Sequence, residues 1–187
     1  MHAARGLDQR ILAYRDSRTT GLTLSHPPYQ LRPVTLADIP ALLALMREMA
    51  EFEGLTDIFR ATHASLANSL CSPTPAAHCL VGLPAEAPDT LVAYAIWFHN
   101  YSSFLDRRGL YLEDLYVQPG HRRRGVGRQF LKELARIALE QECGRFEWVV
   151  LDWNQNAIDF YRHQGAEVLE EWRIVRVTGD ALRHLAA

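Results

Sequence analysis

The sequence predicts a single mixed α/β (α+β) domain. Of its 187 residues, 48% are hydrophobic and 22% are charged, which supports one apolar core and leaves little room for a second domain. Candidate strands cluster in the middle of the chain, and strands alternate with helices in its second half. These two patterns together predict one domain in which a sheet and helices share a core.

The first predicted elements follow a segment without clear periodicity. We interpret residues 1–29 as an N-terminal appendage to a domain over residues 30–187. QLRPV, from Gln30, predicts a short strand, after which Thr35 can cap a helix and Asp38 favours the helix N-terminus. This helix should end at Gly54. Its buried face should carry the apolar residues at helical spacing, Ile39, Leu42, Leu43, Met46, Met49 and Phe52.

Three candidate strands follow a weaker helix over residues 61–71. HCLVGL (78–83) and TLVAYAIWFHN (90–100), separated by the turn PAEAPD, predict a hairpin-like pair. RGLYLEDLYV (108–117) predicts the third strand. Glu113 and Asp114 are adjacent in this strand, so on a regular strand their side chains would point to opposite faces.

The second half of the chain predicts alternating helices and strands. Gly125 to Gln141 predicts an amphipathic helix, and RFEWVVLDW (145–153) a strand covered on both faces. Asn154 can cap the next helix, NQNAIDFYRHQ, which should stop at Gly165. EVLEEWRIVRV (167–177) predicts a last strand, and GDALRHL (179–185) a short closing helix.

Charge and cysteine usage exclude several classes of function. A net charge of −2 argues against a dedicated nucleic-acid binder. The three cysteines form no CxxC pair, which favours a reducing compartment over a disulfide framework or a zinc site. No segment approaches the roughly 18–20 apolar residues of a membrane span, and the N-terminus lacks an apolar signal core. We therefore expect a cytoplasmic protein that binds neither membranes nor nucleic acid.

A basic glycine loop lies between a strand and a helix in YLEDLYVQPGHRRRGVGRQFLKEL (111–134). Such a turn exposes backbone N–H groups at a helix N-terminus, which suits a phosphate. The phosphate-loop pattern of nucleotide triphosphatases, GxxxxGK[ST], does not match because Val126 stands in place of its lysine. The dinucleotide-binding pattern, GxGxxG, does not match because Phe130 stands in place of the third glycine. The pattern that the loop does contain is R-x-x-G-x-G, from Arg122 to Gly127. A solvated basic turn is the alternative interpretation.

This pattern resembles the acyl-CoA loop of the GNAT superfamily of N-acetyltransferases, whose signature is [QR]-x-x-G-x-[GA]. YLEDLYV before the loop and LDWNQNAIDFYRHQGAEV after it resemble the subgroup containing spermidine/spermine and thialysine N-acetyltransferases. The likeness extends from about Leu31 to the end of the chain. It implies a GNAT-like acyl-CoA N-acyltransferase fold, with a central mixed, mostly antiparallel sheet flanked by helices. It also implies acetyl-CoA as the acyl donor, without a metal.

The resemblance further implies a cofactor site. Loop amides would hold the CoA pyrophosphate, and arginine side chains would add charge-assisted bonds. A bulge in the preceding strand would free an N–H near Leu115 for the thioester carbonyl. Asn154 would meet CoA, although capping alone also explains it. The residues implied around the cofactor are Leu115, Tyr116, Val117, Arg122, Arg123, Arg124, Gly125, Val126, Gly127, Arg128, Asn154 and Tyr161.

The same resemblance assigns roles to a tyrosine and three carboxylates. Tyr161 would protonate the departing thiolate as general acid, and Glu113 would accept the ammonium proton, directly or through water. Glu53, Glu113 and Asp114 would bind a cationic acceptor. Each position also has an ordinary structural explanation: Tyr161 as a core aromatic, Glu113 as an edge carboxylate in an ion pair, and Glu53 as a solvated helix end.

These expectations combine into one predicted function. The protein would transfer acetyl from acetyl-CoA to a primary amine of a small cationic acceptor, such as a polyamine, a diamine or a thialysine-like amino acid, by direct attack. Acetylation of a protein or peptide amine or of an aminoglycoside is an alternative, as is a non-catalytic acyl-CoA-binding module. By resemblance, the protein would act as a homodimer.

Overall fold

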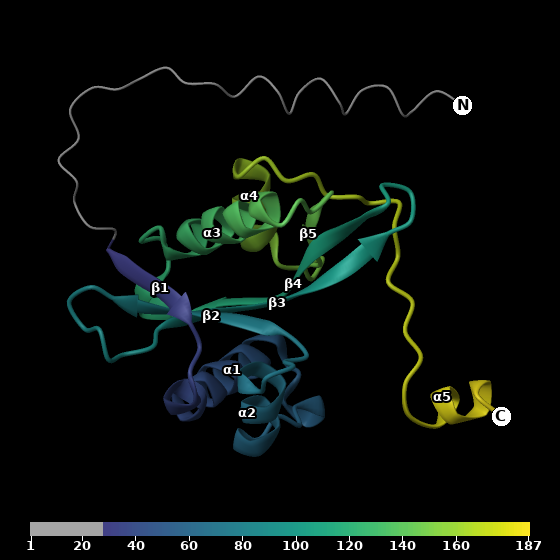
Figure 1. The fold of residues 1–187 in the computed structure, drawn as a ribbon, viewed down its shortest axis with the longest axis horizontal. Coiled ribbons are helices and arrows are strands. Elements are labelled where there is room, and N and C mark those ends of the chain that lie inside the picture. Colours follow the sequence, from purple (N-terminus) through teal and green to yellow (C-terminus); the bar gives the residue numbers. More distant parts are fainter. Residues whose placement is uncertain (1–27) are drawn as a thin grey trace.

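A five-stranded sheet forms the centre of the computed structural model, which describes residues 28–187 (Figure 1). The spatial order of the strands follows their order in the chain, and all neighbours are antiparallel except the last pair, which is parallel. The mixed, mostly antiparallel sheet is therefore as predicted. The strands are β1 (Tyr29–Pro33), β2 (His78–Pro84), β3 (Ala93–Ser102), β4 (Arg107–Val117) and β5 (Phe146–Trp148).

Helices cover both faces of this sheet. Figure 1 shows α3 and α4 on one face and α1 and α2 on the other, while α5 lies apart from both layers. Three short 3₁₀ turns, over Leu36–Asp38, Thr56–Ile58 and Pro119–His121, complete the secondary structure. In the described part of the chain no helix has the length and apolar character to span a bilayer. The α-helices are α1 (Ile39–Glu53), α2 (His63–Cys71), α3 (Val126–Glu140), α4 (Gln155–His163) and α5 (Gly179–Leu185).

The start of α1 shows the local signals that the sequence predicts. Thr35 and Asp38 form a capping box, in which Asp38 Oδ2 accepts from the Thr35 backbone N–H at 2.8 Å. Asp38 also forms a two-point ion pair with Arg32 of β1. Gly54 ends the helix with a left-handed φ of 70°, which glycine adopts without strain.

Each face of the sheet has its own apolar cluster. Phe130, Leu134 and Leu112 belong to the cluster under α3, and Leu42 and Tyr94 belong to the cluster under α1 and α2. One predicted core residue is wrong, because Phe52 is 47% exposed at the last turn of α1. Its ring packs on the exposed Trp153, with ring centroids 5.9 Å apart.

Two predicted strands differ from the structure. The strand expected over residues 145–153 is only three residues long as β5, and residues 167–177 form no strand. Strand propensity alone is insufficient, since a strand also needs a neighbour for its backbone hydrogen bonds. Residues 169–177 are exposed and have no such neighbour within the described chain.

The first strand of the structure, β1, begins at Tyr29, the last residue of the predicted appendage. Tyr29 already belongs to β1 and is 3% exposed, so it is part of the core. Its hydroxyl hydrogen-bonds His121 Nδ1 at 3.0 Å, and its carbonyl accepts from Gln129 of α3. Residues 1–27 of the predicted appendage lie outside the described residues.

Candidate active site

The loop from β4 into α3 presents free backbone donors at a helix N-terminus. From Arg123 through Arg128, the backbone N–H groups donate to no other group among the described residues. The first amide of this helix to find a partner is that of Gln129, which donates to Gly125 O at 3.0 Å. Gly125, with φ of 87°, turns the chain into α3. Six free N–H groups, together with the helix dipole, form a site suited to phosphate.

The arginines of this loop point in different directions. Arg122 folds back, so that its Nε donates to the Val117 carbonyl at 2.9 Å. Its guanidinium lies 5.0 Å from the Phe52 ring centre and 5.8 Å from that of Tyr116. Arg123, Arg124 and Arg128 are exposed. Arg122 therefore braces the loop against β4 and α1, and the other three are available to an anion.

A β-bulge lies in β4 just before this loop. Ile96 of β3 is opposite Asp114, whereas the next residue, Trp97, is opposite Leu112, so Glu113 is an extra residue. Directly opposite residues share a face of the sheet. Leu112 therefore faces α3 with Trp97, and Asp114 faces α1 with Ile96. The implied bulge is present and turns Asp114 toward the end of α1.

The edge of β4 beyond the bulge is open. β5 pairs with β4 only at Leu110, Tyr111 and Leu112, and the two strands then separate. Among residues 28–187, Leu115, Tyr116 and Val117 thus have β3 as a neighbour on one side and no strand on the other. This gap leads from the bulge to the glycine loop, and an extended ligand with amide groups could pair with its exposed backbone.

Three carboxylates meet near the bulge. Burial, together with the negative charges of Glu113 and Glu53, raises the pKa of Asp114 to about 7. Burial also raises the pKa of Glu53 at the end of α1. Glu113 itself is exposed. The structure thus brings together the three predicted acceptor-binding residues, with Asp114 the deepest of them.

Tyr161 on α4 lies close to the same group. Burial, followed by the charge of Glu53, raises the pKa of its phenol to about 12. Its ring packs on Trp148 of β5 and on Phe160, with ring centroids 5.0 Å and 5.3 Å apart. Asn154 caps α4, accepting from the Ala157 N–H at 3.2 Å. The phenol therefore stays protonated at neutral pH in a position fixed by packing.

Sequence reasoning missed Glu48 of α1. Its carboxylate accepts from the Tyr116 hydroxyl at 3.0 Å and from Gln118 Nε2 at 3.0 Å, and it thereby connects α1 to the end of β4. A signal was present, since Glu48 follows the buried Leu45 by three residues and therefore lies near it on the same side of the helix. A charged residue on this side of the helix needs a partner inside the fold.

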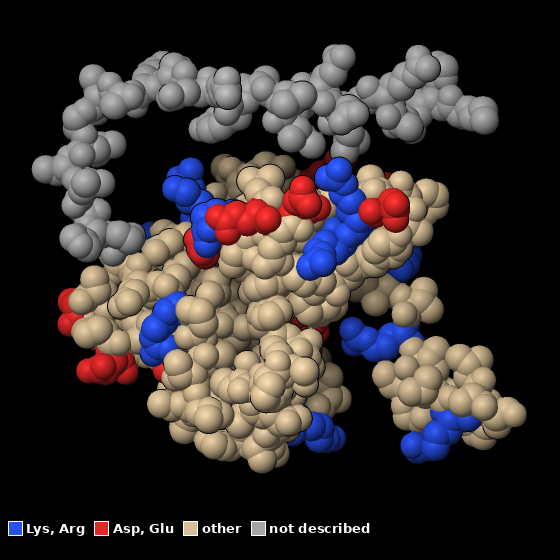
Figure 2. All heavy atoms as spheres, viewed as in Figure 1, with Lys and Arg blue, Asp and Glu red and all other residues tan. Residues whose placement is uncertain are grey.

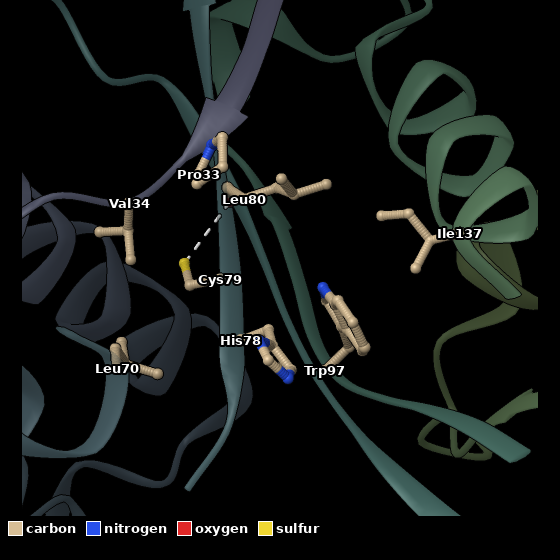
Figure 3. A pocket seen from close by; sticks show the side chains of 8 residues that line it. All are labelled: Pro33, Val34, Leu70, His78, Cys79, Leu80, Trp97 and Ile137. Carbon is tan, nitrogen blue, oxygen red and sulfur yellow. Dashed lines mark hydrogen bonds between the residues drawn. The ribbon is translucent and has the colours of Figure 1, made fainter. Parts of the chain in front are cut away.

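A separate hollow of about 200 Å³ lies where β2 extends past the end of β1 (Figure 3). Its walls come from β1, α2, β2, β3 and α3, and His78 stacks on Trp97 with ring centroids 4.3 Å apart. None of the predicted site residues lines it. The hollow is lined by Pro33, Val34, Leu70, His78, Cys79, Leu80, Trp97 and Ile137.

Charged side chains of both signs lie on the face of the protein that Figure 2 draws. Figure 2 shows acidic and basic side chains mixed over α3, and no broad basic region on the face drawn. Among the residues that the structure describes, no group of three or more His, Cys, Asp or Glu is placed to hold a metal ion.

The chain matches one protein family over most of its described length. Residues 41–166 match the model of the acetyltransferase (GNAT) family. An L-ornithine N5-acetyltransferase from Arabidopsis thaliana is 35% identical over 196 residues, covering 82% of this chain and 86% of that protein. A thialysine N-epsilon-acetyltransferase from Bos taurus is 36% identical over 164 residues, covering 83% and 96%.

Solved structures share the fold. An integron cassette protein from the mobile metagenome of V. cholerae has a TM-score of 0.70 at 24% identity, covering 85% of this chain and 98% of its own. At that identity the likeness shows the fold alone.

Proposed function

The chain belongs to the acetyltransferase (GNAT) family, and we propose that it acetylates a primary amine of a small cationic acceptor, such as a diamine, a polyamine or a thialysine-like amino acid, by direct attack. It is an acetyl-CoA-dependent N-acetyltransferase, as its family and its N-acetyltransferase relatives show. The observation that carries the choice of acceptor is the group of Glu53, Glu113 and Asp114 near Tyr161.

The loop and the open edge of β4 fit the cofactor. The free N–H groups from Arg123 through Arg128 would hold the CoA pyrophosphate, with charge from the exposed arginines around them. The unpaired edge at Leu115, Tyr116 and Val117 would bind the amide-containing arm of CoA. When bound, acetyl-CoA supplies the activated acetyl group.

The carboxylates would bind the acceptor and take up its proton. An alkylammonium has a pKa of about 10.4, so it arrives charged and must lose a proton before attack. Negative charge at the end of α1 attracts such a cation. Asp114, with a pKa of about 7, is partly ionised at neutral pH and is therefore poised as a base. Glu113 is exposed and would act through water.

Tyr161 would assist the leaving group. With a pKa of about 12, the phenol keeps its proton at neutral pH and donates a hydrogen bond to a developing thiolate. It holds this position through its packing on Trp148 and Phe160. The hydrogen bond is strongest when the sulfur carries charge, so it favours the transition state over bound acetyl-CoA.

The names of the relatives suggest which amines to test as acetyl acceptors. The two relatives described above are named for ornithine and thialysine, small amino acids with an additional amine. The test measures thiol release from acetyl-CoA with ornithine, thialysine, lysine, putrescine, spermidine, an aminoglycoside and a lysine-containing peptide. We expect kcat/KM above about 10⁴ M⁻¹s⁻¹ for at least one of the first five. A preference for the peptide or the aminoglycoside would refute the small-amine proposal, and slow turnover with all seven would also count against it.

A further inference from the structure

The face of the sheet that carries Asp114 continues past the end of α1. Side chains alternate along β4, so Tyr111 shares the face of Asp114 once the extra residue of the bulge is counted. Tyr111 is paired with Glu147 of β5, and paired residues lie on one face. Figure 1 shows this end of the β3–β4 hairpin projecting beyond α1 and α2, and both side chains are half-buried. A strip of polar side chains therefore leads from the proposed acceptor carboxylates to β5.

A compact polar group, which we call the β5 cluster, lies at the far end of this strip. It consists of Asn100 of β3, Arg145, which precedes β5, and Glu147. Glu147 Oε1 accepts from Asn100 Nδ2 at 2.5 Å and lies 3.0 Å from Arg145 Nε. The glycine at position 109 makes this arrangement possible, because a Cβ atom on Gly109 would lie 2.3 Å from Asn100 Oδ1 and 3.0 Å from Arg145 Cγ. The three side chains thus meet over the backbone of β4.

The fold leaves several hydrogen-bonding groups of the β5 cluster unused. Both contacts of Glu147 are made by Oε1, and within residues 28–187 its Oε2 accepts no hydrogen bond. In the same part of the chain the Arg145 guanidinium donates no hydrogen bond, since its buried Nε is poorly aligned with Glu147. The buried Asn100 Oδ1 also has no partner there. Buried polar atoms are rarely left in this state, which indicates a site for a polar ligand.

Tyr111 connects the β5 cluster to the acceptor carboxylates. Burial, followed by the charges of Glu113 and Glu147, raises the pKa of its phenol, while the charge of Arg176 lowers it. The phenol is therefore close to both carboxylates. Asp114 lies three residues further along β4, about 10 Å away at roughly 3.3 Å per residue. Because side chains reach inward from both ends, an aliphatic chain of three or four methylene groups spans the remaining distance.

We propose that the β5 cluster binds the α-ammonium and α-carboxylate groups of an amino acid whose terminal amine lies at Asp114, so that Arg145 and Glu147 select amino acids over diamines. The inference rests on the small-amine acceptor proposed above. The α-carboxylate accepts from the planar fork of the Arg145 guanidinium. The α-ammonium donates to Glu147 Oε2 and to the Tyr111 hydroxyl.

Charge balance favours an amino acid over a diamine at this position. A guanidinium beside a carboxylate has no net charge, and the zwitterionic head group of an amino acid has none either. Each charge of the head group then meets an opposite charge of the β5 cluster. The second ammonium of a diamine would pair with Glu147 but would leave the Arg145 guanidinium as a repelling neighbour.

The first test compares ornithine with putrescine, which has the same two amines and lacks the carboxylate. For the parent we expect kcat/KM to be roughly ten-fold higher with ornithine, the lower end of what a hydrogen bond to a charged group contributes, because Arg145 is 38% exposed. Arg145→Gln should bring the ratio close to one by raising KM for ornithine, with kcat and the putrescine constants little changed. A parent that prefers putrescine, or an equal loss with both acceptors in Arg145→Gln, would overturn the proposal.

Two further variants make the comparison specific. Arg108→Gln is the matched control, because Arg108 is an exposed arginine of β4 on the opposite face of the sheet, and it should keep the parent ratio. Glu147→Gln removes the partner of an ammonium that both acceptors carry, so KM should rise for both. A rise for ornithine alone would contradict the assignment of the ammonium to Glu147.

Calorimetric titration of ornithine into the protein saturated with CoA tests the site without turnover. We expect Kd to be roughly ten-fold higher in Arg145→Gln than in the parent and in Arg108→Gln, and Arg145→Lys, which keeps the charge, should lose less. Unchanged circular-dichroism melts would show that the variants are folded. No ornithine binding in the parent, or equal Kd values in the parent and Arg145→Gln, would refute the site. Binding as expected without acetylation of any small amine would instead refute the proposed reaction and leave the site in place.

Discussion

Gly127, in the first turn of α3, faces the ring of Phe160 on α4, and a methyl group added at this glycine would lie 3.5 Å from Phe160 Cζ. That distance is ordinary van der Waals contact, and Gly127 does not have a left-handed φ. The fold therefore accepts alanine at this position. Since neither the available space nor the backbone conformation requires glycine here, we infer that a ligand approaches the backbone closely at this position.

Gly127→Ala should therefore weaken cofactor binding without weakening the fold. We expect KM for acetyl-CoA to rise roughly ten-fold, since a methyl group would hold phosphate away from the free amides. The melting temperature should stay the same or rise slightly, as helix propensity favours alanine. Gly120→Ala is the matched control, because a methyl group there meets nothing within 4 Å and Gly120 precedes the free amides. Equal KM values in both variants would argue against phosphate at Gly127.

Tyr161→Phe removes the proposed proton donor and keeps the ring that packs on Trp148. We expect kcat to fall by roughly 10²–10⁴, the usual contribution of general acid catalysis, while the Kd for CoA changes little. Steady-state kinetics and calorimetric CoA titration measure the two effects separately. Phe160→Leu on the same helix serves as a packing control. Full activity in Tyr161→Phe would remove the phenol from the mechanism.

The pH dependence of kcat/KM should identify the base. Asp114 has a pKa of about 7, so kcat/KM should rise as pH increases through this value and the carboxylate loses its proton. Asp114→Asn should abolish this inflection. Glu113→Gln should move it to lower pH, because it removes a negative neighbour that raises the pKa of Asp114. The opposite result, with the inflection lost only in Glu113→Gln, would make Glu113 the base.

Asp114 should also lower the stability of the protein at alkaline pH. Its pKa is raised from 3.8 to about 7, so the folded state binds a proton more tightly than the unfolded state between these values. The contribution of Asp114 to the free energy of unfolding is therefore highest below pH 4. It falls by up to about 4 kcal/mol as the pH rises to 7 and above. Urea unfolding should accordingly show Asp114→Asn to be more stable than the parent at pH 8 and similar to it at pH 4. Equal stability at both pH values would contradict the buried position.

Short-range sequence signals predicted the fold well. Thr35, Asp38, Gly54 and Asn154 act within one turn of the chain, and the structure shows each at the predicted helix end. The mixed sheet, the fold class and the acetyltransferase class are confirmed. Where a partner comes from elsewhere, local reasoning is wrong, as at residues 167–177. Those residues have strand propensity, but the neighbour that a strand requires is not encoded in the segment itself.

The candidate site likewise combines features that a local sequence pattern predicts with features that depend on residues far apart in the chain. The glycine loop is a local pattern, so its place before α3 could be predicted from spacing. The depth of Asp114 depends on the bulge at Glu113 and on the end of α1, and neither can be derived from the two carboxylates alone. The direction of Arg122 depends on Phe52 and Val117, which belong to other elements. The catalytic and binding roles of these residues stay predictions.

Asp38 should make the largest single polar contribution to stability in the described part of the chain. Its carboxylate accepts from both Nη atoms of Arg32, at 2.6 Å and 2.8 Å, and from the backbone and hydroxyl of Thr35. The Arg32 guanidinium is the main cause that holds the pKa of Asp38 well below its usual range. This ion pair joins β1 to the start of α1, and with it one helical layer to the edge of the sheet.

Asp38→Asn keeps the shape of the side chain and one acceptor oxygen for Thr35, but it loses the charge that pairs with Arg32. The guanidinium is a third exposed and stays partly solvated, so we expect a loss of about 2–3 kcal/mol at pH 7 by urea unfolding, less than for a fully buried pair. Arg32→Lys, which keeps the charge and loses the two-point geometry, should cost about 1 kcal/mol.

The loss of stability at acid pH provides an independent check on the contribution of Asp38. A carboxylate whose folded pKa is lowered stabilises the protein above its unfolded pKa of about 3.9, and this stabilisation is lost as pH falls toward the folded value. The parent should therefore lose stability steeply below about pH 4, and Asp38→Asn should lose less over the same range. Parallel acid limbs for the two proteins would show that the pair with Arg32 carries no net stabilisation, because the cost of desolvating the two charges then equals their attraction.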